Sequence, residues 1–258
     1  MRLSYRTALA CACTWLCLAF SQPVNAQLQE AAMYTAYIGT AEIATTNAQW
    51  DKVVADRQET FKNNNSNTNR WNLVLAQYGL MGSTMRNRDE KRFDKYYEAA
   101  EVHLQALAKD DVMKAEAKAL LSALYGLKMG YAPMAGMALG PKSSGLIEDA
   151  LKLAPQSPLA WRIEASSKMY TPSMFGGDMD EAIEAFVKCI GLFEKQPETL
   201  KNNWMYLDAH VFLGQAYTSE GQTANAIAIY EKALKLEPNL GWVKYDLLPK
   251  AKQKALGK

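Results

Sequence analysis

The sequence is poor in the residues on which most metal and redox chemistry depends. Only two histidines, His103 and His210, occur among 258 residues, which leaves almost no room for a histidine-based metal site. The formal net charge is only +2, and phosphate binding requires a clear basic excess, so we expect no nucleic-acid partner. With 49% hydrophobic and 22% charged residues, the composition is that of a globular protein long enough to bury a core.

Long apolar runs are also missing. The clearest apolar segment is 7–20 (TALACACTWLCLAF), which is too short for a helix that must cross ~30 Å of hydrocarbon. Arg2 and Arg6 precede it, and Val24-Asn25-Ala26 supplies the small residues that signal peptidase requires. We therefore expect a signal peptide, 1–26, and export to the periplasm of a Gram-negative bacterium with no membrane-spanning segment left. A retained anchor and secretion to the medium are less favoured.

Cysteine becomes scarcer still once this leader is removed. Three of the four cysteines lie within it, so Cys189 is the last one in the mature chain and no intramolecular disulfide can form. The leader also removes two arginines and no acidic residue, which leaves 27 basic and 27 acidic residues. The flanks of Cys189 (FVKCIGLF) have the pattern of a buried helix face, so we predict a packed core residue and not a reactive thiol.

What the sequence does contain is an internal repeat, clearest at 207–238. Gly214 and Ala226 are small where two helices of a hairpin must cross closely. Gly221 can end the first helix in the left-handed conformation, and Pro238 stops the second. The residues at the repeat positions are Leu207, Leu213, Gly214, Tyr217, Ala226, Tyr230, Ala233 and Pro238.

Weaker copies of the pattern lie upstream. In the copy at 157–194, Trp161 and Ala165 occupy positions of the first helix, and a lengthened turn precedes the second helix. Nearer the N-terminus the spacing is less regular. The further matching residues are Trp71, Tyr78, Tyr97, Ala100, Leu104, Ile147, Ala150, Pro155, Ala182, Phe186 and Cys189.

These repeats predict an all-α fold. Apolar residues recur at helical spacing and no segment alternates like a strand. We expect residues 27–258 to form a single domain, a right-handed superhelix of about five stacked helix-turn-helix hairpins, with a C-terminal capping helix at 242–248. The expected helices are 28–45, 48–62, 69–84, 89–108, 112–130, 144–153, 157–170, 179–194, 201–219, 223–236 and 239–248, with a short tail helix after Pro249.

Two glycine-rich segments interrupt the repeats. The first, 131–145 (YAPMAGMALGPKSSG), resembles a phosphate-binding loop in composition, but its glycines are too close together and a proline precedes the lysine. We predict an elongated turn there, with Ser143 or Ser144 capping the next helix. Whether the segment also contacts a ligand stays open.

The second segment is 171–178 (TPSMFGGD). Its two acidic residues near the end hint at a calcium loop, but the further oxygen ligands are missing. We predict instead that Pro172 ends one helix and that Asp178 caps the next in a capping box with Glu181. Contact of this loop with a ligand is the alternative.

No constellation of catalytic residues is present. Each histidine lies within a predicted helix, and no serine or cysteine motif adjoins it. The mixed cluster at 86–92 (RNRDEKR) is interpreted as a solvated turn. We therefore expect no enzyme activity, no catalytic residue, no metal and no cofactor.

The repeat resembles that of tetratricopeptide-repeat proteins, strongly over 157–238 and weakly over 48–156. The segments Gln77-Tyr78-Gly79, Tyr170-Thr171-Pro172 and Asp246-Leu247-Leu248-Pro249 are similar to those of exported bacterial repeat proteins without an assigned activity. The resemblance implies a tetratricopeptide-like scaffold that binds protein, peptide or sometimes a small molecule on its concave face. By repeat position, the exposed groove residues are Arg162, Ser166, Tyr170, Asp208, Gln215 and Ser219.

Two functions are compatible with this resemblance. The first is an exported, non-catalytic scaffold that holds a protein or peptide partner, with Arg162 making a charge contact and Tyr170 a stacking contact. The alternative is a periplasmic small-molecule-binding component that accompanies a transporter, with the loops at 131–145 and 171–178 lining its pocket. A closed apolar cavity would favour the alternative, and an open groove would count against it.

Overall fold

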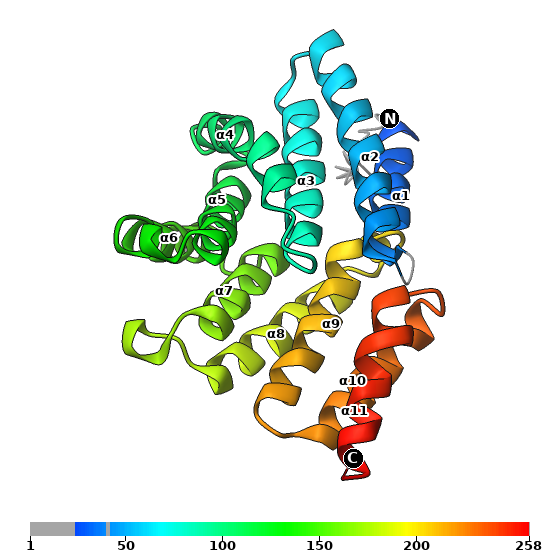
Figure 1. Ribbon diagram of the computed structural model, residues 1–258. Coiled ribbons are helices and arrows are strands. Elements are labelled where there is room, and N and C mark those ends of the chain that lie inside the picture. Colours follow the sequence, from blue (N-terminus) through cyan, green and yellow to red (C-terminus); the bar gives the residue numbers. More distant parts are fainter. Residues whose placement is uncertain (1–23, 40–41, 258) are drawn as a thin grey trace, which may run out of the picture.

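The chain folds into stacked helix pairs (Figure 1). The structure, a computed structural model, describes residues 24–39 and 42–257, and within these ranges it has eleven α-helices and no β-strand. The predicted all-α fold class is confirmed. The helices are α1 (Val24–Ile38), α2 (Ile43–Asn63), α3 (Asn67–Thr84), α4 (Glu90–Leu107), α5 (Lys114–Tyr131), α6 (Gly136–Leu153), α7 (Pro158–Tyr170), α8 (Met179–Glu194), α9 (Trp204–Ser219), α10 (Thr223–Leu236) and α11 (Leu248–Ala255).

The helices form five successive pairs, α1–α2 to α9–α10, and α11 covers the last pair. This is the predicted superhelix of about five hairpins with a C-terminal cap. The first helices of the pairs contact one another along an inner layer that runs through α1, α3, α5, α7 and α9. Residues 1–23 of the predicted leader lie outside the described residues, so its cleavage stays a prediction.

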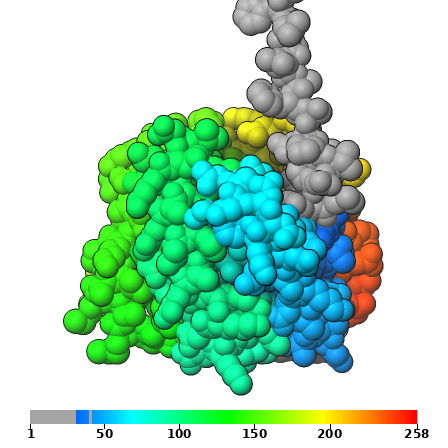
Figure 2. Space-filling model, turned by 90° about the horizontal axis from the view of Figure 1, so that it is seen from above, coloured from blue at the N-terminus to red at the C-terminus, as the bar shows by residue number. Residues whose placement is uncertain are grey.

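The superhelix closes on itself, which the sequence does not predict. Helix α1 contacts α9, and the Tyr34 hydroxyl donates a hydrogen bond to Glu237 Oε2 at 2.9 Å, across 203 residues of sequence. The Tyr37 ring lies 5.3 Å from that of Trp204. In the space-filling view, the blue N-terminal residues abut the orange C-terminal ones (Figure 2). The inner layer is therefore covered at its centre.

The core confirms the roles predicted for the small repeat residues. A Cβ on Gly214 would lie 2.2 Å from the Tyr230 ring, so α9 and α10 can cross only because no side chain is there. Gly221 has φ +69° and ends α9 in the left-handed conformation. Cys189 is fully buried, and burial raises the pKa of its thiol to about 12, as expected for a packed residue and not a nucleophile.

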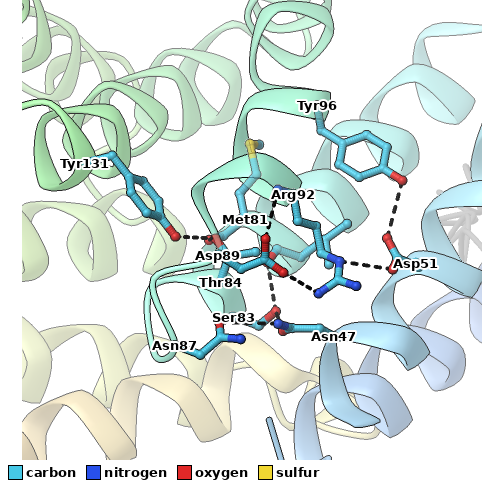
Figure 3. A network of polar contacts seen from close by, with 11 residues as sticks. Asn47, Asp51, Met81, Ser83, Thr84, Asn87, Asp89, Arg92, Tyr96 and Tyr131 are labelled. Carbon is cyan, nitrogen blue, oxygen red and sulfur yellow. Dashed lines mark hydrogen bonds and ion pairs between the residues drawn. The ribbon is translucent and has the colours of Figure 1, made fainter. Parts of the chain in front are cut away.

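Ion pairs and hydrogen bonds connect the region of the α3–α4 turn to the neighbouring helices α2 and α5 (Figure 3). Arg92 forms ion pairs with Asp89 at 2.6 Å and with Asp51 of α2 at 3.2 Å. On the other side of the turn, the Tyr131 hydroxyl of α5 donates to Thr84 Oγ1 at 2.9 Å. The segment 86–92 is thus an exposed turn over most of its length, as predicted, but Arg92 also joins α4 to α2 through Asp51.

The predicted elongated turn at 131–145 is largely helical. After a short 3₁₀ turn at Pro133–Ala135, α6 begins at Gly136 and continues through Pro141. Ser143 does not cap a helix but lies inside α6, where its hydroxyl donates to the Ser122 carbonyl oxygen of α5 at 3.0 Å. Packing against α5 thus stabilises a helix whose glycines and proline disfavour it locally.

Two other helix boundaries differ from the prediction. The helix expected at 28–45 is two helices, because α1 ends at Ile38 and α2 begins at Ile43. The helix expected to stop before Pro249 runs through it, since a π-helical turn at Val243–Leu247 leads directly into α11. Pro249 fits there because a π turn already shifts the hydrogen-bond ladder that proline would interrupt.

Candidate binding surfaces

Two of the six predicted groove residues are buried at the centre of the inner layer. Arg162 on α7 and Asp208 on α9 form an ion pair, in which Arg162 Nε donates to Asp208 Oδ2 at 2.7 Å. A second guanidinium nitrogen donates to the Tyr78 hydroxyl of α3. Arg162 is 5% exposed and Asp208 4%. The prediction that both are exposed is wrong, because α1 and α3 close over positions that face solvent in an open superhelix.

The two charges stabilise each other against burial. Burial by itself lowers the pKa of Arg162, but Asp208, together with Tyr78 and Tyr37, more than offsets this and holds that pKa above its ordinary value. Burial raises the pKa of the Asp208 carboxyl, and the guanidinium opposes that rise. Arg162 and Asp208 therefore form a structural pair that is not free to contact a partner.

The other four predicted residues line the rim of this inner face. Tyr170 is 62% exposed and Ser219 is also exposed, whereas Ser166 and Gln215 are half-buried. Ser166 Oγ and Gln215 Nε2 are buried without a hydrogen-bond partner among the described residues. The repeat positions thus locate an exposed side chain, Tyr170, at the rim. They also locate two buried polar groups, the Ser166 hydroxyl and the Gln215 amide nitrogen, that form no hydrogen bond within the described residues.

An aromatic ladder extends from this edge. It consists of Tyr170, Phe212 and Trp242, whose ring centroids are 6.3 Å and 6.4 Å apart in succession, each pair edge-to-face. The Arg162 guanidinium lies 5.1 Å from the Phe212 ring, and that of Arg86 lies 4.5 Å from the Trp242 ring. The ladder therefore joins α7, α9 and the C-terminal cap to the α3–α4 turn.

Arg86 differs from Arg162 because no carboxylate pairs with it. No hydrogen bond or ion pair joins its half-buried guanidinium to the residues that the structure describes, although Asp246 is near enough to act on it electrostatically. Burial lowers the pKa of Arg86, and Tyr37 and Asp246 only partly offset this. Sequence reasoning missed Arg86, Phe212 and Trp242 as site residues, since no local pattern connects positions so far apart.

A separate cleft of 450 Å³ lies between α6, α7 and the turn that follows α7. The turn has the predicted structure: Asp178 caps α8 by accepting a hydrogen bond from the Glu181 N–H at 2.9 Å. The Glu181 side chain does not complete the capping box but forms an ion pair with Lys168 at 2.5 Å. The cleft opens to solvent and is lined by Ile147, Glu148, Leu151, Lys152, Glu164, Lys168, Thr171 and Phe175, among others.

The two histidines occupy helices, as predicted, and the more buried one is neutral. His210 on α9 is fully buried, and its Nδ1 lies 2.8 Å from the Tyr206 carbonyl oxygen. Burial lowers the pKa of His210 from 6.5 to about 4. Among residues 24–39 and 42–257, no group of three or more histidine, cysteine or acidic side chains is arranged to hold a metal ion.

We expect His210 to make the protein sensitive to mild acid. The unfolded chain takes up a proton below pH 6.5, but the folded chain does so only near pH 4, so stability is lost as the pH falls between these values. Between pH 7 and 5 this loss is about 2 kcal/mol. In urea unfolding at both pH values, His210→Phe should remove about that much of the pH dependence. An unchanged pH dependence in the variant would contradict the neutral state.

No helix in the described part of the chain combines the length and apolar character needed to cross a bilayer. Helical hairpins stacked into a superhelix define the class as a helical-repeat protein. The family model of the tetratricopeptide repeat matches residues 207–240, which contain most of α9 and all of α10. Residues 207–240 therefore contain a tetratricopeptide repeat, in line with the resemblance of this segment, and such repeats suggest a scaffold for protein–protein interaction.

Comparisons with individual proteins add little to this assignment. No curated protein matches the sequence. Among solved structures, the crystal structure of BtubC (BKLC) from P. vanneervenii is similar, with 17% sequence identity and a TM-score of 0.42. The match covers 81% of this chain and 80% of that one. The assignment thus depends on the helices themselves and on the repeat at 207–240.

Proposed function

We propose that the protein is an exported, non-catalytic scaffold that binds a segment of a partner protein along the aromatic ladder. Tetratricopeptide repeats commonly bind protein partners, and proteins of this kind are generally non-catalytic. The bacterial periplasm is the compartment that the N-terminal sequence favours. The partner segment would lie on the inner face, at the exposed edge that Tyr170 marks.

The observation that supports this proposal best is the Arg86 guanidinium at the end of the ladder. A half-buried cation without a carboxylate is costly to keep, and a partner carboxylate can offset that cost while neighbouring aromatic rings take up apolar side chains. Aromatic and arginine side chains are also the residues that most often dominate binding energy at protein interfaces. We therefore expect a partner segment with an acidic group beside an apolar side chain.

This site can be tested by affinity capture from a periplasmic extract, using protein purified from the same fraction, in which we expect an N-terminus at Gln27. Tyr170→Ala and Arg86→Gln should each weaken capture of the same partner at least tenfold. The matched controls are Tyr245→Ala, a 61% exposed tyrosine outside the ladder, and Arg88→Gln, an exposed arginine of the same turn. Undiminished capture by both ladder variants would refute the assignment.

The alternative function, small-molecule binding, would use the α6–α7 cleft. Its volume of 450 Å³ lies in the range of ligand pockets, and Thr171 and Phe175 of the predicted loop line it. However, the cleft opens to solvent, and salt-bridged lysines and glutamates line it beside the apolar residues. An open, charged cleft suits a segment of protein better than an enclosed solute.

A further inference from the structure

The α6–α7 cleft contains a carboxylate that the fold leaves without a partner. Glu164 on α7 lines the cleft and is half-buried, and it forms no ion pair or hydrogen bond with any residue in the described part of the chain. Burial is the main cause of the raised pKa of its carboxyl, and the charges around it contribute less. Such a group is a standing cost to folding.

The two lysines that line the cleft are already engaged elsewhere. Lys152 pairs with Glu148 at 2.7 Å, four residues earlier on α6. Lys168 pairs with Glu181 of α8 at 2.5 Å, and it lies only close enough to Glu164 to act on it without forming an ion pair. The charged residues that line the cleft are two glutamates and two lysines, but Lys168 pairs with Glu181 outside the lining, so Glu164 has no cation of its own.

The rest of the cleft combines apolar side chains with the hydroxyl groups of Ser144, Ser167 and Thr171. Ile147 and Leu151 of α6 line it from one side, and Phe175, which is 70% exposed, lines it from the turn after α7. Gly177 fixes this turn, because a Cβ there would lie 1.7 Å from the Thr171 carbonyl oxygen. A cleft that contains both an exposed phenylalanine and an unpaired carboxylate is suited to a long basic side chain, whose methylene groups are apolar and whose end is charged.

We propose that the α6–α7 cleft binds a peptide segment of a partner protein through an arginine or lysine that pairs with Glu164, next to an apolar residue that packs on Phe175. This site is separate from the aromatic ladder. Arg162, Ser166 and Tyr170 lie along one face of α7, whereas Glu164 and Lys168 lie along the opposite face, because two residues correspond to about 200° of helical rotation. The scaffold would therefore hold segments on both faces of α7.

The experiment is a selection from a phage library of random heptapeptides on the purified protein, followed by affinity measurements on the selected synthetic peptides. We expect peptides in which arginine or lysine adjoins an apolar residue, and Glu164→Gln should weaken their binding at least tenfold. Glu164→Lys should select acidic peptides instead. The matched control is Glu148→Gln, which changes the same group in the same cleft but removes a carboxylate that is paired with Lys152. It should change affinity by less than twofold.

Three further readouts decide the outcome. The melting temperature of Glu164→Gln should equal or exceed that of the wild type, so a loss of binding cannot be a loss of folding. Tyr170→Ala should bind these peptides normally, which separates this site from the ladder. The proposal is overturned if no selected peptide depends on Glu164. It is also overturned if agmatine alone binds as tightly as the peptides, since the ligand would then be a free amine.

Discussion

Replacing Asp208 with leucine is expected to lower the free energy of unfolding by about 3–5 kcal/mol. The substitution leaves the Arg162 guanidinium buried at the centre of the inner layer without its counter-charge, and water cannot reach a side chain that is 5% exposed. Urea unfolding followed by circular dichroism measures the effect. The same substitution at an exposed carboxylate, Glu198→Leu, should change the free energy by less than about 0.5 kcal/mol.

A double variant distinguishes the loss of a counter-charge from a simple packing defect. Arg162→Met combined with Asp208→Leu removes both charges, and it should recover most of the stability that Asp208→Leu loses. Recovery will be incomplete because the Tyr78 hydroxyl loses its hydrogen-bond donor. If the double variant were less stable than Asp208→Leu alone, the loss in the single variant would be a packing defect and not the loss of a counter-charge.

The second large effect is expected for Gly79→Ala, which should destabilise the protein by about 3 kcal/mol. A Cβ at this position of α3 would lie 2.3 Å from Cη2 of Trp50, and Trp50 is 1% exposed. The indole cannot move away easily, because its other side packs edge-to-face on Trp204 at 5.5 Å. Helix α2 would have to separate from α3, at the expense of the N-terminal core.

The same helix supplies the control. Gly82 lies three residues further along α3, and a Cβ there would meet no atom within 4 Å. Gly82→Ala should therefore stabilise the protein by up to about 1 kcal/mol, the difference in helix propensity. Thermal or urea unfolding of the two variants would show opposite signs. A destabilisation of equal size at both positions would mean that glycine in α3 is required for backbone reasons and not for the approach of Trp50.

Much of the fold could be predicted because repeat positions encode contacts within one hairpin. The helices at 179–194 and 223–236 have the predicted bounds, since their apolar spacing, caps and stops are local signals. Gly214 faces Tyr230 only because the two lie on adjacent helices of one repeat. Burial of Cys189 follows from the same local periodicity.

The candidate site was less predictable. Repeat position correctly placed Tyr170 at an exposed edge, but it also placed Arg162 and Asp208 there, and these are buried. The difference arises because repeat positions assume an open superhelix. Contacts of α1 with α9, across most of the chain, decide whether that superhelix stays open, and no local pattern reports them.

The scarcity of histidine and cysteine, the balance of charge and the helical repeat are properties of the sequence itself, and the repeat determines the all-α class. Only the tertiary structure decided that the superhelix closes, that Arg86 meets Trp242 at the end of an aromatic ladder, and that α6 continues through Pro141. The physical reason is the same in each case. Local propensity and spacing act within a few helical turns, whereas closure, stacking and burial depend on the summed packing of residues far apart in the chain.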